Sequence, residues 1–289
     1  FSLLKSYGDF SFQVYVKKYG KPDIIHAHNM LFGGLIGHIF SEKYGVPLFL
    51  TEHSSEHCYA HLDFFSREHA AKGFRQIKNI TAVSPALIKQ LRDKYSIAED
   101  KIEWFPNVIP SDFEEEELVV KSIEKDFLFL NVANLIPLKG QLDLIEAFYL
   151  VQDKMPTSKL KIVGGGPLEQ ELKLLVEKYN LQKKVSILGY CNRTEVLDQM
   201  KLCNVFVFPS HYETFGVVLI EALAQGKPVI ATTCGGPECI VNERNGLLVA
   251  PKDAEGLSQA LYKMYLDDNN YKAQEIRKDL IERFGNQKF

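Results

Sequence analysis

Short apolar runs alternate with longer segments of helical periodicity along the whole chain. Runs such as FLFLNV at 127–132 and VFVF at 205–208 lack the period-two alternation of strands that expose one face. Such runs are typical of parallel strands that helices cover on both faces. The pattern therefore predicts an α/β protein whose parallel sheets are built from βαβ units. The predicted strands are Asp23–Ala27, Pro47–Thr51, Asn79–Val83, Lys101–Phe105, Phe127–Val132, Lys159–Val163, Lys184–Leu188, Asn204–Phe208, Pro228–Ala231 and Leu247–Val249.

Two helices of the first half have recognisable ends. The segment Gly33–Tyr44 is followed by Gly45, a residue suited to the left-handed position that closes a helix. The segment Pro85–Tyr95 follows Ser84, which is a good N-cap, and it has proline at its first helical position. Both helices are therefore expected between predicted strands.

An acidic stretch separates the two halves of this pattern. It contains four consecutive glutamates, Glu114 to Glu117, and is too polar to belong to a core. A solvated stretch of this kind marks a domain boundary. We therefore expect an N-terminal domain at residues 1–110, a linker at 111–126 and a C-terminal domain at 127–289.

Composition narrows the class of protein. Apolar residues make up 46% of the chain and charged residues 25%, and the formal net charge is −3, which gives no broad basic footprint for nucleic acid. No apolar run reaches the roughly 18 residues of a membrane-spanning helix, and the opening FSLLKSYGDF does not resemble a signal peptide. The cysteines are odd in number and form no C-x-x-C pair, so we expect a reduced, cytoplasmic protein; they are Cys58, Cys191, Cys203, Cys234 and Cys239.

Polar and glycine residues gather directly after the predicted strands. In open parallel sheets, ligands bind at the carboxyl ends of the strands. If these edges of the two domains face each other, the ligand lies in a cleft between them. The residues at these positions are His26, His28, Glu52, His53, Ser84, Pro106, Asn107, Asn134, Lys139, Gly164–Gly166, Gly189–Tyr190, Ser210–Glu213 and Thr232–Gly236.

The most informative stretch is SHYETFGVVLIEALAQGKPVIAT at 210–232. A loop carrying Glu213 leads into a helix that begins near Gly216 and ends at Gly226, and Glu221 is the one charged residue of the apolar helix body. A lone carboxylate on a buried helix is costly unless something binds it. The alternative is a core glutamate satisfied by the backbone or by a nearby arginine. The helix start at Gly216 offers N–H groups that attract phosphate, so a sugar diphosphate joined to a ribose would match the stretch.

The E-x7-E pattern of Glu213 and Glu221 resembles the signature of a large family of retaining glycosyltransferases. The family (family 4-like, group 1) includes bacterial mannosyl- and glucosyltransferases and the glycogen and sucrose synthases. Supporting segments follow in order along nearly the whole chain: DIIHAHN, LTEHSS, AVSPALIKQL, WFPNVIP, NVANLIPLKGQLDLIEAF, LKIVGGGPLEQEL, VSILGYCNRTEV and CGGPECIVNERNGLLV. The resemblance implies two Rossmann-like domains facing across a cleft, the glycosyltransferase B-type fold. It also implies that part of the N-terminal domain precedes Phe1, which would leave the strand Asp23–Ala27 as an edge, and that a closing helix follows.

The resemblance assigns roles to residues of the C-terminal half. Glu221 would bind the ribose and Glu213 the transferred hexose, while Lys139 would neutralise the diphosphate. Asn134 stands where the family usually has an arginine, so one of two cations at the diphosphate is absent. The backbone near the distal phosphate would come from Phe215, Gly216 and Val217, and the backbone near the base from Gly189 and Tyr190.

The N-terminal half contributes His53, the histidine of TEHSS, which resembles the one that approaches the transferred sugar. The implied reaction moves a hexose from a nucleotide-diphosphate sugar to a saccharide or lipid-linked acceptor, with retention of configuration, as in polysaccharide biosynthesis. Peripheral association with the inner face of a membrane would suit a lipid-linked acceptor. The alternatives of the same fold are a nucleotide-sugar epimerase and a catalytically inactive nucleotide-sugar-binding module.

No metal ion or other cofactor is expected. The chain contains no D-x-D motif that would bridge Mg²⁺ to a diphosphate. His53, Glu56 and His57 spell H-x-x-E-H, a pattern of zinc peptidases, but it begins at the end of a strand rather than inside a helix. We therefore prefer histidines without a metal for His57, His61 and His69. The turn Gly164–Pro167 lacks the G-x-G-x-x-G spacing of dinucleotide-binding proteins and is interpreted as a tight turn before a helix.

Overall fold

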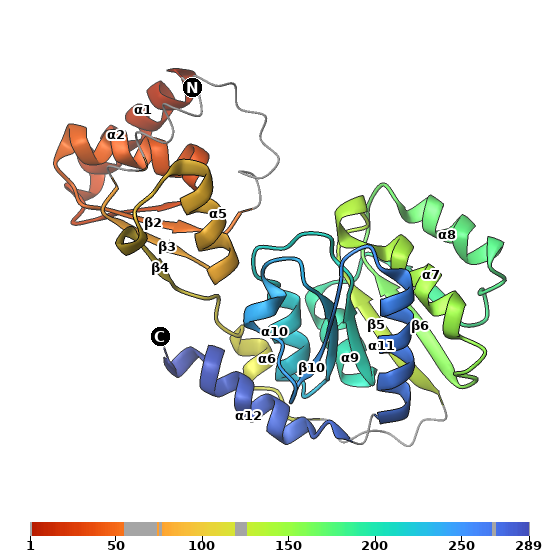
Figure 1. Ribbon diagram of the computed structural model, residues 1–289. Coiled ribbons are helices and arrows are strands. Elements are labelled where there is room, and N and C mark those ends of the chain that lie inside the picture. The colour runs from red at the N-terminus through yellow and green to blue at the C-terminus, as the bar shows by residue number, and fades with distance from the viewer. Residues whose placement is uncertain (1, 55–73, 75–76, 119–125, 268–269, 289) are drawn as a thin grey trace. The chain divides into compact units, whose positions relative to one another are not determined.

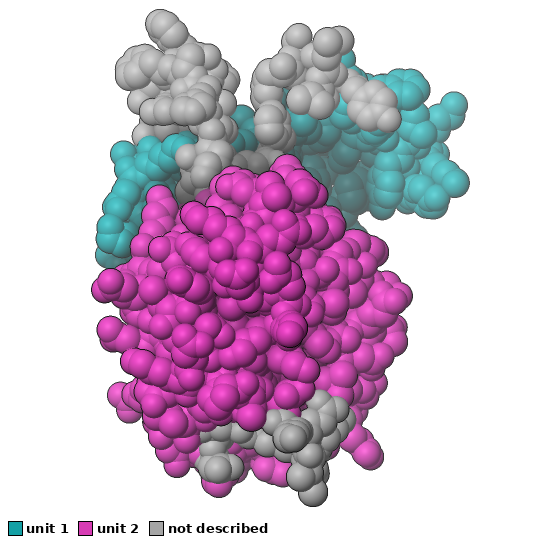
Figure 2. Space-filling view, turned by 90° about the vertical axis from the view of Figure 1, so that its right-hand side faces the viewer, with its two compact units in different colours: residues 1–106 teal, residues 107–289 magenta. Residues whose placement is uncertain are grey.

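The computed structural model describes residues 2–54, 74, 77–118, 126–267 and 270–288. The chain divides into two compact units, Phe1–Pro106 and Asn107–Phe289, which Figure 2 shows in different colours. The boundary falls earlier than the predicted linker at 111–126. The described start of that segment packs on the second unit, because Phe113 is buried there and its carbonyl oxygen accepts a hydrogen bond from Gln225 Nε2 (2.9 Å).

The first unit contains a parallel sheet of four strands in the order β1-β2-β3-β4 among the described residues (Figure 1). Each strand starts and ends within two residues of its predicted bounds. The pattern of buried residues predicts where a strand lies more accurately than where it ends. Helix α5 has the predicted bounds and cap, with the Leu87 N–H donating to Ser84 Oγ (3.1 Å). Helix α1 was not predicted. The expected helix Gly33–Tyr44 begins two residues later, at Leu35, and a π-helical turn at Met30–Gly34 precedes it. The elements are α1 (Ser2–Tyr19), β1 (Ile25–His28), α2 (Leu35–Tyr44), β2 (Leu48–Glu52), β3 (Asn79–Ala82), α5 (Pro85–Tyr95) and β4 (Ile102–Trp104).

The second unit contains a parallel sheet of six strands in the order β10-β9-β8-β5-β6-β7 (Figure 1). All six were predicted, and β5 has the predicted bounds. The elements are α6 (Ser111–Glu114), β5 (Phe127–Val132), α7 (Gln141–Val151), β6 (Ser158–Val163), α8 (Glu169–Lys178), β7 (Val185–Gly189), α9 (Arg193–Leu202), β8 (Val205–Phe208), α10 (Val217–Ala224), β9 (Val229–Thr232), β10 (Gly246–Val249), α11 (Ala254–Asp267) and α12 (Ala273–Phe284).

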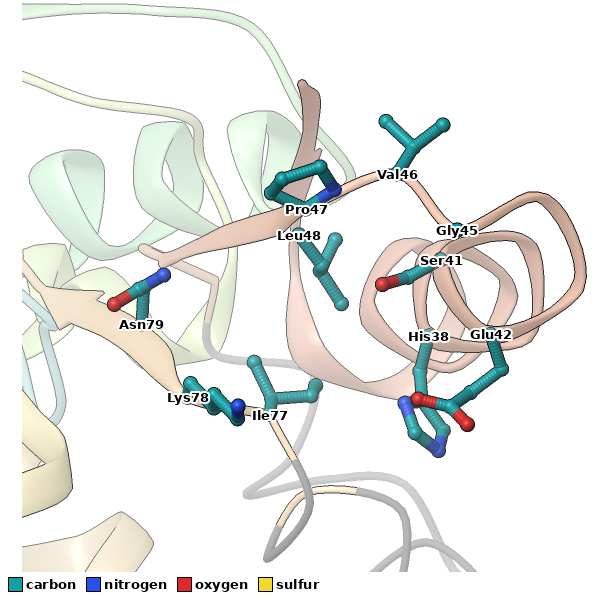
Figure 3. Close-up of a pocket in the computed structure, with 10 residues that line it drawn as sticks. All are labelled: His38, Ser41, Glu42, Gly45, Val46, Pro47, Leu48, Ile77, Lys78 and Asn79. Atoms are coloured by element: carbon teal, nitrogen blue, oxygen red, sulfur yellow. The ribbon is translucent and has the colours of Figure 1, made fainter. Parts of the chain in front are cut away.

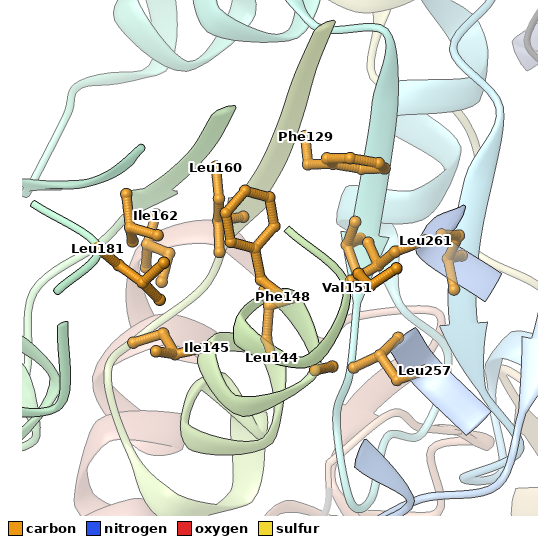
Figure 4. Close-up of a cluster of buried hydrophobic side chains, with 14 of the residues drawn as sticks. Phe129, Leu144, Ile145, Phe148, Val151, Leu160, Ile162, Leu181, Leu257 and Leu261 are labelled. Carbon is orange, nitrogen blue, oxygen red and sulfur yellow. The ribbon is translucent and has the colours of Figure 1, made fainter. Parts of the chain in front are cut away.

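Both faces of this second sheet are covered. On one face, helices α7, α8 and α11 cover the sheet, and Phe129, Leu144, Phe148 and Leu261 are fully buried members of the apolar cluster there (Figure 4). Strand β8 alternates between the two faces, and its side chains on both are buried to within 2% exposure. This confirms the interpretation of the continuous apolar runs as strands that are covered on both faces.

Candidate functional site

The site lies where the order of strands in the second sheet reverses. From the neighbouring strands β5 and β8 the chain runs outward in opposite directions, through β6 and β7 on one side and β9 and β10 on the other. The loops after β5 and β8 therefore separate at their shared edge, which is where open parallel sheets bind ligands. These loops carry Lys139 and Glu213, which were predicted from the sequence as members of one site.

Lys139 is placed by the turn that joins β5 to α7. A 3-10 turn at Pro137–Lys139 ends in Gly140, whose φ of 67° is left-handed. A Cβ on Gly140 would stand 2.0 Å from the carbonyl oxygen of Pro209, so only glycine lets the two loops approach this closely. The lysine Nζ lies 5.6 Å from the centre of the Phe208 ring. The K-G pair thus holds an ammonium group over the end of β8.

Glu213 is held by the loop that follows β9. Its N–H donates to the Cys234 carbonyl (3.1 Å), and its carbonyl accepts from the Gly236 N–H (2.8 Å). Its carboxylate Oε2 lies 2.7 Å from Lys139 Nζ, and both side chains are 19% exposed. Three loops thus converge on one partly shielded ion pair between residues that lie far apart in the sequence.

Helix α10 starts beside this pair. Gly216 precedes it with a left-handed φ of 99°, and Phe215 is buried against Phe284 at 5.7 Å between ring centres. Val217, the first helical residue, is 39% exposed, so the amino end of the helix is open to solvent. Backbone N–H groups at such an end favour an anion.

Glu221 has a different charged partner from Glu213. Its carboxylate Oε1 lies 3.5 Å from Arg193 Nη1, and Arg193 also forms a two-bond pair with Asp112 and stacks 4.9 Å from the ring of Phe113. Burial raises the pKa of Glu221 to about 7; the Arg193 charge opposes that rise and the Asp112 charge adds to it. This is the arrangement of the alternative interpretation, a buried glutamate with a nearby arginine.

The other predicted positions lie on neighbouring loops. Asn134 has an exposed side chain, and its carbonyl accepts a hydrogen bond from Gln141 Nε2 (3.1 Å). Gly189 ends β7 with a φ of 74°, and Tyr190 after it is 84% exposed. The turn at Gly164–Gly166 packs against the loop after β5, and helix α8 follows it from Glu169, as expected of a tight turn before a helix.

In the first unit, His53 follows β2 and hydrogen bonds through Nε2 to His28 Nδ1 at 3.2 Å. Glu52 beside it is 1% exposed, and its two oxygens accept the N–H groups of Met30 (2.6 Å) and Ser54 (2.8 Å). This buried carboxylate ties the loop after β1 to the loop after β2, so it holds the backbone on both sides of the histidine pair. His26 lies next to His28, and its pKa is lowered by burial and then by the neighbouring imidazole.

The H-x-x-E-H segment falls largely outside the described residues, because Glu56, His57 and His61 are not among them, nor is His69. Within the described parts of the chain, no three acidic, histidine or cysteine side chains converge as metal ligands do. A hollow of about 340 Å³ in the first unit is lined by His38, Glu42 and Lys78 among others (Figure 3). It lies at the amino ends of β2 and β3, the edge opposite to His28 and His53.

Two features of the site were missed in the sequence. Arg193 has a weak local signal, since it follows the N-cap Asn192 of a capping box completed by Glu195. His211 and Asp143 form a hydrogen bond at 2.6 Å; His211 lies in the segment Ser210–Glu213 after a predicted strand but was assigned no role, and Asp143 was not singled out. Burial raises the pKa of the Cys203 and Cys234 thiols to about 12, so both thiols are neutral. Among the described helices, none is both long and apolar enough to cross a bilayer.

Comparison with known families matches nearly the whole chain. Residues 112–283 match the family described as glycosyl transferases group 1, and residues 5–113 match glycosyltransferase family 4. The putative teichuronic acid biosynthesis glycosyltransferase TuaC of Bacillus subtilis is 30% identical over 275 residues, which are 90% of this chain and 65% of that protein. The UDP-Gal:alpha-D-GlcNAc-diphosphoundecaprenol alpha-1,3-galactosyltransferase of Escherichia coli is 28% identical over 288 residues, 92% of this chain and 72% of that enzyme. The chain thus spans about two thirds to three quarters of these relatives.

Among solved structures, HepE of Anabaena in complex with UDP shares the fold. Its TM-score is 0.81 at 21% sequence identity, and the match covers 96% of this chain and 78% of that one. The predicted fold class, α/β with two parallel sheets as in the B-type glycosyltransferases, is confirmed.

Proposed function

The chain belongs to the glycosyl transferases of group 1, and from this premise we propose that it transfers a hexose from a nucleotide-diphosphate sugar to a saccharide or lipid-linked acceptor. We propose further that the transfer retains the configuration of the sugar and needs no metal ion. The observation that carries the proposal is the ion pair of Lys139 and Glu213 at the point where the strand order reverses. It offers a cation for a diphosphate beside a carboxylate for sugar hydroxyls.

The chemistry follows from these groups. Negative charge develops on the diphosphate as it leaves, and preorganised donors lower the energy of that transition state. Lys139 Nζ and the N–H groups at the start of α10 are such donors. Donor binding would draw Lys139 from Glu213 towards phosphate and leave the carboxylate to accept hydrogen bonds from the hexose. The retaining course is that of the family, in which the donor phosphate takes the acceptor proton and no protein nucleophile is needed.

Glu221 is proposed to bind the ribose, with Gly189 and Tyr190 near the base. Arg193 Nη1 lies 3.5 Å from one oxygen of this carboxylate. Two donors can therefore meet at Glu221, one from the protein and one from the ligand. UDP-sugars are the first donors to test, since the Anabaena protein binds UDP, and the name of the E. coli relative suggests a diphosphoundecaprenol-linked acceptor.

One observation favours the inactive alternative, because the uncharged Asn134 stands where the family usually has a cation. Thermal-shift binding against UDP-, GDP- and ADP-sugars tests the donor, and chromatography of the donor with and without acceptor tests the reaction. Transfer requires an acceptor, epimerisation proceeds without one, and an inactive module shifts the melting temperature without turnover. Activity is expected to survive EDTA; loss with EDTA and recovery with Mg²⁺ or Zn²⁺ would refute the metal-independent proposal.

A further inference from the structure

His211 and Asp143 form a pair that the roles assigned above do not use. His211 Nε2 donates to Asp143 Oδ2 at 2.6 Å, and the two side chains are 21% and 26% exposed. His211 lies in the loop after β8, two residues before Glu213. Asp143 lies in the first turn of α7, four residues after Lys139. The pair therefore joins, by side chains, the two segments that carry the ammonium and carboxylate groups of the site.

Backbone contacts bring the same two segments together. The His211 N–H donates to the carbonyl of Leu138 at 2.8 Å, one residue before Lys139. Gly140 approaches the carbonyl of Pro209 so closely that a Cβ would not fit. The backbone brings the two loops together at Leu138 and Gly140, and the side-chain pair adds a separate contact between the loop after β8 and helix α7.

We propose that His211 and Asp143 are positioning residues of the donor site. They hold the loops after β5 and β8 so that Lys139 and Glu213 present their charges at a constant separation to a sugar diphosphate. The inference rests on the proposed function for the identity of the ligand. Neither residue touches the reacting atoms in this scheme, because both act through the segments that they join.

A merely structural pair would behave differently. It would stabilise the second unit, and its loss would weaken the binding of every ligand to the same extent. A positioning pair acts on the diphosphate more than on the nucleoside, because Lys139 would meet only the phosphates. The ratio between UDP and uridine affinities therefore separates the two roles.

Isothermal titration calorimetry of the full chain with UDP and with uridine provides this ratio. We expect His211→Ala and Asp143→Ala each to weaken UDP binding about ten-fold and uridine binding less than about two-fold. The double variant should be no weaker than either single variant, since residues that act as one unit are not additive. His211→Gln and Asp143→Asn keep a hydrogen bond and should recover most of the affinity.

Tyr265→Phe is the matched control. It removes another tertiary side-chain hydrogen bond of the same unit, that of Tyr265 Oη with Thr157 Oγ1 (2.9 Å), at the opposite edge of the sheet. UDP binding should not change in this variant. Equal losses for UDP and uridine, or additive losses in the double variant, would overturn the proposal.

A second arm needs no ligand. The coupling between Lys139 and Glu213 can be measured from urea unfolding of the two single alanine variants and the double variant, with and without His211→Ala. We expect the substitution to reduce that coupling by about half or more, and an unchanged coupling would contradict the proposal. If the wild-type chain binds no nucleotide diphosphate, the proposed function fails, and this arm decides the positioning role by itself.

Discussion

The two units build the carboxyl edges of their sheets by different means. In the second unit, apolar side chains fill both faces of the sheet, and the charged groups stand on loops beyond the strand ends. In the first unit, a polar chain runs across the strands themselves: His26 bonds Thr51 (2.9 Å), Thr51 bonds Thr81 (3.0 Å), and Glu52 ends β2 as a buried carboxylate. Hydrophobic packing therefore supports the carboxyl edge of the sheet in the second unit, and side-chain hydrogen bonds support much of that edge in the first unit.

This difference has a consequence for stability. The second unit is stabilised by its apolar core. Residues on its loops, such as Lys139 and Glu213, should therefore be replaceable with little loss of stability. Loss of one partner of a buried hydrogen bond is strongly destabilising, because the other partner remains buried without a hydrogen bond. Substitution of the buried Glu52 should therefore disturb folding and function together, whereas substitutions near Lys139 should separate them.

The largest effect is expected in the apolar core. Phe148 is fully buried and lies 6.3 Å from the ring of Phe129, so Phe148→Ala should lower the free energy of unfolding of the second unit by about 3–5 kcal/mol. Circular dichroism in urea should show this loss. The chain's single tryptophan, Trp104, lies in the first unit, and its fluorescence transition should stay unchanged. A matching shift in Trp104 fluorescence would show that the units unfold as one.

The next effect concerns the buried carboxylate of the first unit. Glu52→Ala removes the acceptor for two backbone N–H groups and should lower stability by about 3 kcal/mol, seen in the Trp104 transition. Glu103→Ala, on the exposed side of β4, is the control and should change little. Equal free energies of unfolding for the two variants would show that the hydrogen bonds of Glu52 do not stabilise this unit.

Glu221 should make stability depend on pH. The carboxyl has an ordinary pKa of 4.5 and a folded pKa of about 7, so the folded state retains a proton that the unfolded state releases. The free energy of unfolding should therefore fall as pH rises from about 4.5 to 7, by roughly 3 kcal/mol at most. Glu221→Gln should abolish this slope, whereas the exposed Glu243→Gln should keep it. Identical pH profiles for wild type and Glu221→Gln would contradict the raised pKa.

Donor binding should depend on the second unit alone. Lys139→Ala should weaken UDP binding about ten-fold or more and uridine binding far less, since a charge-assisted bond is worth about 1.5–3 kcal/mol. His53→Ala should leave UDP binding within about two-fold and should lower transfer. Calorimetry provides the affinities, with Lys173→Ala on the exposed surface of α8 as the control. An equal loss of UDP and uridine would place Lys139 away from the phosphates.

The smallest effect is expected from restoring a cation. Asn134→Arg adds a guanidinium on the exposed loop after β5 and should tighten UDP binding about three-fold, because a charge at a solvated site is partly screened. Uridine affinity should not change in this variant. An unchanged UDP affinity would show that Lys139 and the start of α10 already suffice.

Much of the fold was predictable because it depends on local patterns. The run FLFLNV is β5 with the predicted bounds, and α5 starts at Pro85 with Ser84 as its cap, as the sequence indicated. The acidic stretch was a less reliable guide, because Phe113 lies within it and packs on the second unit. A run of charged residues predicts that the segment as a whole is solvated. It does not show whether a single aromatic side chain within the segment, here Phe113, is buried.

By itself, the sequence determined the α/β class and the strands of both sheets. It also gave Lys139 and Glu213 as candidates after strand ends and Glu221 as a candidate on an apolar helix. Periodicity and capping are properties of neighbouring residues, so they can be predicted without knowing which strands pair. Only the tertiary structure decided that β5 and β8 lie side by side, that Lys139 meets Glu213, and that His211 reaches Asp143. It also gave Glu221 the partner Arg193. These contacts join loops that only the order of strands brings together, and no local pattern encodes that order.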